Sequence, residues 1–277
     1  MYKFIPIHKT LVWGTESWVL SAVPGDESVV AEGPDAGKKI TDIYPGQFPL
    51  LVKFIDARQD LSIQVHPDDR LAARYGGSGK TEMWYVISAE EDARIISGLK
   101  SEITPEEYDK LIAGNDIKSV LAEYRTVPGD VFYLPAGRIH AIGKGCHLAE
   151  IQQTSAITFR IYDYGRPGLD GKPRQLHTRQ AREAIDYTVY GDYRTHYVAK
   201  PDKLVELVRC PHFVTSLLET DKPYVSRNSS DIQIVVCVEG SVKVNGTSLT
   251  AGEAGLLLEE KLNLVPDAAS KLLLVRR

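Results

Sequence analysis

Short apolar runs, each ended by glycine, proline or aspartate, recur along this chain and constrain its fold more than any other feature. Such runs, separated by frequent turn residues, are the signature of an antiparallel barrel or sandwich. The sequence therefore predicts a mainly β protein. The predicted strands are PLLVKFIDA, LSIQVH, EMWYVIS, ARIIS, VFYLP, LAEIQQ, ITFRIYDY, FVTSLLE, IQIVVCVEG, SVKVN, GLLLEE and KLLLVRR.

Two segments interrupt this pattern with helical signals. A helical insert is expected over 104–123, where Thr104 and Glu107 can form a capping box on TPEEYDKLIAG, followed by IKSVLAEY. Such an insert would cover one side of a barrel. A second amphipathic helix is expected near HTRQAREAID, after the turn-rich GRPGLDGKP.

Two polar residues in the run LSIQVH are candidate metal ligands. Gln64 and His66 are two positions apart, so in a strand both side chains point to the same face, and Val65 points to the opposite layer. Pro67 ends regular pairing and places the pair at a strand end, where sites are usually built. Either residue alone would be read as an ordinary half-buried polar group.

The segment PGDVFYLPAGRIH carries a third candidate. It combines two tight turns, a short strand and His140, and it fits the pattern G-x5-P-x-G-x2-H from Gly129 to Pro135, Gly137 and His140. This spacing resembles the second motif of the cupin superfamily, whose small jelly-roll barrels hold a metal inside. Lys144 replaces the asparagine that usually closes the motif, which weakens the match without affecting the ligand.

Glu82, in GKTEMWYV, completes a set of four ligand-type side chains with Gln64, His66 and His140. Two imidazoles, a carboxylate and an amide oxygen suit zinc or a similar divalent metal, and they leave room for water or substrate. The three stretches are far apart in the sequence, so the site exists only if folding brings them together.

An internal comparison predicts a second barrel or half-barrel. AGEAGLLLEEKLN can be laid over PGDVFYLPAGRIH so that Gly252 falls on Gly129, and His140 is then replaced by Asn263. The strand pattern recurs without the ligand. We therefore expect a metal-binding cupin domain over 1–199, including the helical insert, and a degenerate jelly-roll domain over 200–277.

Composition excludes several classes of protein. The chain has 277 residues, is 43% hydrophobic and carries a formal net charge of −4, so it can bury a large core and has no basic field for nucleic acid. Its 3 cysteines are widely spaced, which indicates neither a disulfide framework nor a zinc knuckle. It has no membrane-length apolar run and no secretory signal, so we expect a cytoplasmic protein.

Several motifs together resemble the class I mannose-6-phosphate isomerases, most closely their short bacterial form. QVHPDD, GKTEMWYV, LPAGRIHA and LAEIQQTSAITFRIYD occur in this order within residues 1–165, whereas the last third matches only in general character. In that family the metal is zinc. The resemblance implies that Gln64, His66, Glu82 and His140 bind one zinc ion per chain.

The resemblance also implies a reaction, the interconversion of mannose 6-phosphate and fructose 6-phosphate through an enediol. Its catalytic candidates fall on Lys80, Glu150 and Arg160. Many relatives carry an acid four residues before the arginine, where this chain has Ala156, so a mechanism that needs that acid cannot operate here.

The sequence is also compatible with two other functions. An iron-dependent cupin oxygenase would use similar ligands, but it does not favour an amide ligand. A non-catalytic sugar-phosphate-binding cupin could keep the ligands and the pocket without turnover. If the ligand is a sugar phosphate, the expected partner is a small molecule and neither nucleic acid nor a membrane. The chain is expected to be a monomer or a homodimer.

Overall fold

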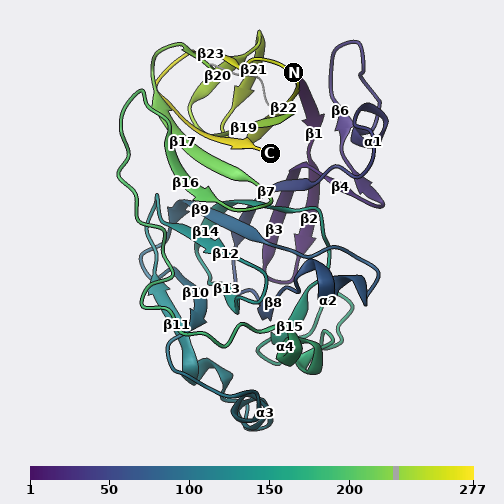
Figure 1. Cartoon of the computed structure of the whole chain (residues 1–277), viewed down its shortest axis with the longest axis vertical. Coiled ribbons are helices and arrows are strands. Elements are labelled where there is room, and N and C mark those ends of the chain that lie inside the picture. The colour runs from purple at the N-terminus through teal and green to yellow at the C-terminus, as the bar shows by residue number, and fades with distance from the viewer. Residues whose placement is uncertain (227–230) are drawn as a thin grey trace. The chain divides into compact units, whose positions relative to one another are not determined.

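The computed structural model describes residues 1–226 and 231–277 and is mainly β, which confirms the predicted fold class (Figure 1). Packing divides the chain into two compact units. Unit 1 contains Met1–Ile7, Trp18–Val52 and Thr195–Arg277, and unit 2 contains His8–Ser17 and Lys53–Arg194. Every predicted site residue belongs to unit 2.

The strands of unit 2 belong to two antiparallel sheets. The six-stranded sheet has the order β12 (Val131–Leu134), β9 (Glu82–Ala89), β14 (Cys146–Gln153), β7 (Leu50–Ala57), β3 (Gly14–Leu20) and β2 (Ile7–Leu11). The five-stranded sheet has the order β11 (Leu121–Arg125), β10 (Arg94–Leu99), β13 (His140–Ile142), β8 (Ile63–Val65) and β15 (Phe159–Tyr162). The strands predicted from short apolar runs in this region are confirmed.

The inner faces of the two sheets share one apolar cluster. Ile55, Trp84 and Phe132 come from the six-stranded sheet, and Ile95 and Ile142 come from the five-stranded sheet. Because side chains alternate between the two faces of a strand, several polar residues of the same strands also point to the inner face. These are Lys53, Glu82 and Glu150 from the larger sheet and Gln64, His140 and Arg160 from the smaller one.

Helices cover the outer face of the five-stranded sheet. Ile63, Val65 and Phe159 point outward and share a buried cluster with Tyr108 and Ala181. Tyr108 lies in α3 (Pro105–Ala113) and Ala181 in α4 (Thr178–Ala184), while α2 (Asp69–Ala73) adds Leu71. Of these helices, α4 lies directly on β15 and β8, whereas α3, the helix of the predicted insert, packs mainly against α4 and η1.

The predicted helical insert is shorter than expected. Thr104 and Glu107 form the predicted capping box, but the helix ends at Ala113. The range 104–123 was wrong in its second half, because Ile117–Val120 is a single 3-10 turn, η1, and Leu121 already begins β11. Pairing of β11 with β10 overrides the local helical pattern there.

The turn before β13 fixes the entry of His140 into the barrel. Gly137 has a φ of +90°, and its N–H donates to the His66 carbonyl at 2.8 Å. An added Cβ would lie 3.0 Å from the Ala184 carbonyl oxygen and 3.1 Å from the Asp186 nitrogen. Only glycine fits this backbone and this space, which explains the Pro-x-Gly part of the motif.

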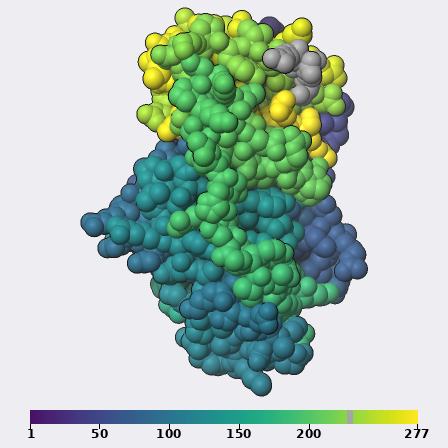
Figure 2. Space-filling view, turned by 60° about the vertical axis from the view of Figure 1, so that its left-hand side comes forward, coloured from purple at the N-terminus to yellow at the C-terminus, as the bar shows by residue number. Residues whose placement is uncertain are grey.

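The segment after α4 runs beside β10 and β11 (Figure 1), and Figure 2 shows it in green against the teal surface of unit 2. The Tyr193 hydroxyl donates to the Leu99 carbonyl at 2.8 Å, and the Arg194 guanidinium donates to the Arg125 carbonyl at 2.9 Å. The rings of Tyr190 and Tyr193 lie 4.8 and 4.4 Å from the guanidinium of Arg138. This segment therefore holds the turn that carries His140.

Unit 1 is also built from strands. Its larger sheet has the order β16 (Val205–Arg209), β17 (Val214–Thr220), β24 (Ser270–Arg276), β19 (Ile232–Glu239), β22 (Glu253–Leu258), β1 (Tyr2–Ile5) and β6 (Val29–Val30). A second sheet has the order β18 (Tyr224–Val225), β23 (Asn263–Pro266), β20 (Ser241–Val244) and β21 (Thr247–Thr250). A short ribbon of β4 (Ala22–Val23) and β5 (Asp26–Glu27) and the helix α1 (Ile40–Ile43) complete it.

The two segments compared in the sequence have the same local geometry. The Gly129 N–H donates to Val86 of β9 at 2.8 Å, and the Gly252 N–H donates to Cys237 of β19 at 2.9 Å. Both glycines have a φ near +90° and precede a strand that pairs with the acceptor strand. Asn263 begins β23 as His140 begins β13, but its side chain is exposed to solvent.

The boundaries of the two units differ from the predicted domain boundary between residues 199 and 200. Unit 2 ends at Arg194, and two N-terminal stretches group with the C-terminal part because β1 pairs with β22. The functional division into a metal-binding and a degenerate domain stays a prediction. Within the described ranges, no helix has the length and apolar character needed to cross a membrane.

Candidate metal centre and active site

Gln64 lies in β8, between β13 and β15 of the five-stranded sheet, at the point where the site forms. It lies opposite His140 of β13 on one side and opposite Arg160 of β15 on the other. Directly opposed residues in an antiparallel pair point to the same face. The ladder therefore places a predicted ligand between a second predicted ligand and a predicted catalytic arginine.

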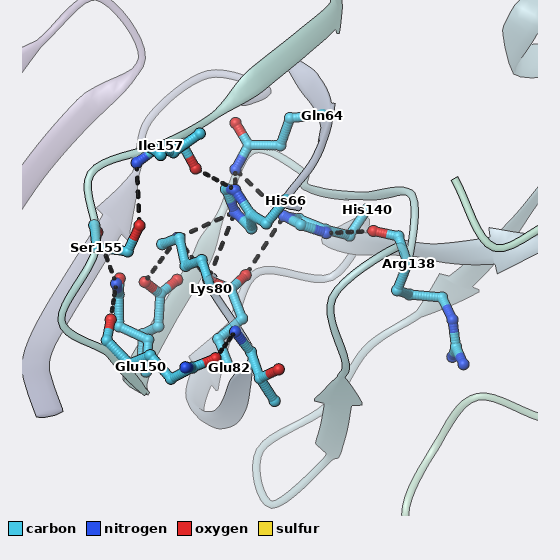
Figure 3. Close-up of polar contacts among 12 residues, drawn as sticks. Gln64, His66, Lys80, Glu82, Arg138, His140, Glu150, Ser155 and Ile157 are labelled. Carbon is cyan, nitrogen blue, oxygen red and sulfur yellow. Dashed lines mark hydrogen bonds and ion pairs between the residues drawn. The ribbon is translucent and has the colours of Figure 1, made fainter. Parts of the chain in front are cut away.

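Three buried side chains converge at this point from both sheets (Figure 3). His66, Glu82 and His140 each offer one ligand atom, and these atoms lie within 4.8 Å of one another. One carboxylate oxygen of Glu82 is 3.3 Å from Nε2 of His140, and the other is 3.6 Å from Nε2 of His66. Two imidazoles and a carboxylate around one point form a set that binds zinc or a similar metal.

Backbone carbonyl groups set the orientation of both imidazoles. Nδ1 of His66 lies 2.9 Å from the Ile157 carbonyl oxygen, and Nδ1 of His140 lies 2.9 Å from the Arg138 carbonyl oxygen. A carbonyl only accepts, so each Nδ1 must carry the proton, and each Nε2 keeps a free lone pair. This is the arrangement that metal-binding histidines need.

Gln64 brings its amide to the same point. Its Nε2 lies 3.2 Å from Nε2 of His140, while its Oε1 accepts from the Ser62 hydroxyl at 3.3 Å. Half a turn of the amide exchanges oxygen and nitrogen within the same volume. The four predicted ligands therefore lie together, and this rotation would turn the Gln64 oxygen toward His140.

The charges of the site fit a cation. The Glu82 carboxylate is completely buried, and its Oε1 accepts no hydrogen bond. The Lys80 ammonium lies 2.5 Å from the other oxygen of Glu82 and 3.0 Å from Nε2 of His66. A positive group thus already contacts two of the predicted ligands, which shows that this point favours a cation.

Glu150 is held by groups that the sequence analysis missed. One of its oxygens is 2.9 Å from the Lys53 ammonium, and the other accepts from the indole N–H of Trp84 at 2.7 Å. Lys53 also contacts Glu16 at 3.3 Å. A lysine within the apolar run PLLVKFIDA was the available signal, because an unpaired lysine is rarely buried.

The surroundings of the two acids of the site, Glu82 and Glu150, shift their pKa values in opposite directions. Burial, followed by the negative charge of Glu150, raises the pKa of Glu82. Burial would also raise the pKa of Glu150, but the charges of Lys53 and Lys80 outweigh it and lower that pKa. Glu150 is therefore the acid that stays ionised.

Arg160 faces a cavity of about 180 Å³ that also includes Gln64, Lys80, His140 and Glu150. One guanidinium nitrogen of Arg160 donates to the Gln175 carbonyl at 2.9 Å, and its buried Nε has no partner. All three predicted catalytic residues thus line a cavity that His140 of the cluster also lines.

The remaining histidines lie outside the three-residue cluster. His147 stacks on Phe54 with a centroid distance of 6.3 Å. His177 approaches the site through the backbone, since its Nδ1 accepts from the Arg160 N–H at 3.2 Å. Ala156, which replaces the acid found in many relatives, is exposed and adds no charge.

A barrel with inward imidazoles and an inward carboxylate defines a metal-binding protein of the cupin type. A model of the type I phosphomannose isomerase catalytic domain matches residues 15–95. The mannose-6-phosphate isomerase ManA of Bacillus subtilis is 36% identical over an alignment of 241 residues, and the match covers 76% of this chain and 76% of that protein. The chain therefore belongs to the type I mannose-6-phosphate isomerase family.

Solved structures agree with this assignment. The mannose 6-phosphate isomerase from Bacillus subtilis superimposes with a TM-score of 0.87 at 28% identity and covers 100% of this chain and 99% of its own. A zinc-bound mannose 6-phosphate isomerase has a TM-score of 0.77 at 15% identity over 100% and 99% of the two chains, and it shares the fold.

We predict that His140→Ala abolishes high-affinity zinc binding by the purified protein, because it removes one of two imidazoles at the cluster. His147→Ala is the matched control, since it removes a histidine of unit 2 that lies outside the cluster. Metal content after dialysis and titration with zinc would measure the effect. Equal zinc affinity in the two variants would contradict the assignment of His140.

A second prediction concerns pH in the metal-free protein. Burial, followed by the charge of Lys80, lowers the pKa of His140 from 6.5 to about 3. Below pH 6.5 the unfolded chain therefore binds a proton that the folded chain does not, and folding stability falls by up to about 1.4 kcal/mol per pH unit. His140→Gln should lose less stability than the wild type between pH 7 and pH 5.

Urea unfolding of both proteins without metal measures this difference. The comparison is needed because the raised pKa of Glu82 acts in the opposite direction in the same range, and it is common to both proteins. Parallel stability profiles would show that His140 is not held neutral by the fold.

Proposed function

We propose that this chain is a zinc-dependent isomerase that interconverts mannose 6-phosphate and fructose 6-phosphate through an enediol. The observation that carries the proposal is the cluster of His66, Glu82 and His140 beside a cavity, which His140 lines together with charged groups of both signs. The names of the relatives in the family support the substrate. A zinc-bound relative with the same fold supports the metal.

In this proposal Gln64, His66, Glu82 and His140 hold the zinc. When bound, zinc supplies a Lewis acid that polarises a carbonyl group and stabilises negative charge on neighbouring oxygens. The two backbone carbonyls that fix the imidazole tautomers keep the ligand atoms in place before the metal arrives.

Glu150 and Lys80 are the proposed proton-carrying pair. The reaction moves the proton of C2 to C1 and the hydroxyl proton of C2 to the oxygen of C1, so a group that accepts and returns protons must face both carbons. Glu150 is ionised and therefore able to accept a proton. The Lys80 ammonium lies 3.7 Å from its oxygen and can share that proton.

Arg160 is proposed to stabilise the enediolate. Its guanidinium is permanently charged and lines the cavity next to Gln64, so its donors face the region where negative charge develops. Donors fixed before the reaction cost no reorganisation in the transition state.

The experiment that tests the function is isomerisation of mannose 6-phosphate in deuterated water by the zinc-loaded chain. We expect fructose 6-phosphate to form and deuterium from the solvent to appear in the sugar. A protein that binds the sugar phosphate without turnover or exchange would be a sensor, and consumption of oxygen with iron would indicate an oxygenase. Either result would refute the proposal.

Replacement of Arg160 should lower turnover without loss of metal. Arg160→Lys keeps the charge but loses the planar pair of donors, so we expect kcat to fall about tenfold or more, as for the loss of one charge-assisted hydrogen bond. Arg179→Lys, at an exposed position of α4, is the control. A wild-type kcat for Arg160→Lys at full zinc content would remove Arg160 from the reaction.

A further inference from the structure

Trp84 is a buried residue of the site that the proposed function leaves without a role. It is 1% exposed and packs in the apolar cluster between the two sheets, with Phe132 and Ile142 among its neighbours. It also lines the cavity together with His140 and Glu150. A buried indole N–H is destabilising unless it finds an acceptor, so the partner of this group indicates what the residue does.

The acceptor of the indole N–H is Glu150, and the strand pairing explains why. Trp84 in β9 lies directly opposite Glu150 in β14, so both side chains point to the same face of the sheet. The N–H donates to Oε2 of Glu150 at 2.7 Å. This hydrogen bond is charge-assisted, because the lowered pKa of Glu150 keeps its carboxylate ionised. Glu150 is 3% exposed, so the contact lies away from bulk water.

The two oxygens of Glu150 have different neighbours as a result. Oε2 faces the indole, whereas Oε1 lies 2.9 Å from the Lys53 ammonium and 3.7 Å from the Lys80 ammonium. The last torsion of a glutamate side chain is broad, so a carboxylate without fixed partners turns easily. The Trp84 N–H therefore holds the carboxylate plane so that one oxygen faces Lys80, the group with which Glu150 is proposed to share a proton.

The same indole contacts the proposed metal ligand His140. The two ring centroids are 5.3 Å apart and the ring planes are at 85°, which is the edge-to-face arrangement that aromatic rings prefer. The Arg138 carbonyl holds Nδ1 of His140 at 2.9 Å, but one hydrogen bond leaves the imidazole free to tilt about it. The indole limits that tilt. Trp84 thus contacts both a proposed ligand and the proposed proton carrier.

We propose that Trp84 is a positioning residue of the active site, which holds the Glu150 carboxylate toward Lys80 through its N–H and braces the His140 imidazole through its ring. This inference rests on the proposed function and deepens it, because it names a residue that acts through the proton carrier and the ligand. The two parts of the side chain have separable effects. Loss of the N–H alone affects turnover, and loss of the ring also affects the metal.

The first test compares Trp84→Phe with Phe132→Leu in the full-length, zinc-loaded chain. Trp84→Phe keeps a ring beside His140 and removes the N–H. We therefore expect kcat for mannose 6-phosphate to fall about tenfold or more, as for the loss of one hydrogen bond to a charged group, with KM changed less than twofold and zinc content unchanged.

Phe132→Leu is the matched control. Phe132 lies opposite Trp84 on its other side, in β12, is fully buried and belongs to the same apolar cluster, but it is not among the residues that line the cavity. This variant should change kcat less than threefold. A wild-type kcat in Trp84→Phe would overturn the inference. An equal loss in Phe132→Leu would do so as well, because it would indicate a general loosening of the core.

The second test asks whether Trp84 acts through Glu150. Glu150→Gln removes the group that is proposed to carry the proton, so Trp84→Phe should lower kcat less than twofold in that background. Equal losses from Trp84→Phe with and without Glu150→Gln would show that the indole acts by another route and would refute the role of its N–H. A wild type that isomerises the sugar at the same rate as Trp84→Phe would refute the inference and leave the proposed function intact.

The third test is independent of turnover. Trp84→Leu removes the ring as well as the N–H, so titration with zinc should show an affinity at least threefold weaker than that of Trp84→Phe, which keeps the wild-type value. Equal zinc affinity in Trp84→Leu and Trp84→Phe would refute the bracing of His140. Zinc affinities in the expected order, in a chain that does not isomerise the sugar, would refute the proposed function and with it the role of the N–H, and would leave the role of the ring intact.

Discussion

The alternation of side chains across the five-stranded sheet is the constraint on which the site depends. Ile63 and Val65 pack under the helices, so Gln64 between them must point into the barrel, and the same parity turns His140 and Arg160 inward. A shift of register by one residue would expose the apolar set and remove the polar set from the cavity. The apolar packing of the outer face therefore positions the chemistry of the inner face.

The polar end of the barrel carries buried charge that a stability argument alone does not explain. Lys53, Lys80, Glu82 and Glu150 all have side chains that are less than 10% exposed. Removing charges from water is costly, and ion pairs return only part of that cost. These groups pair with one another, and Glu82 brings an oxygen that accepts no hydrogen bond next to the imidazole of His140. The cluster is best understood as a cavity prepared for a cation and a polar substrate.

The sequence predicted the parts of this site that depend on local pattern. The period of two in LSIQVH aligned Gln64 with the cavity, and the turn motif delivered His140 at the start of a strand. Features set by long-range pairing were not predictable in this way. The 104–123 insert ends early because β11 pairs with β10, and the first strand joins a sheet formed mainly by the last third of the chain. Trp84 is an ordinary apolar letter of the predicted strand EMWYVIS, so its contact with Glu150 of another strand required the fold.

The contact of Arg138 with two tyrosines has a consequence for how the chain could be shortened. Its carbonyl accepts from the ring of His140, while its guanidinium is held between Tyr190 and Tyr193, more than forty positions further along. A fragment cut directly after α4 would retain every proposed zinc ligand and yet lose the aromatic clamp on the residue that orients one of them. Any shortened chain that is to hold its imidazoles ready for metal therefore has to keep Tyr190 and Tyr193, because part of the rigidity of the centre is supplied from outside the barrel wall.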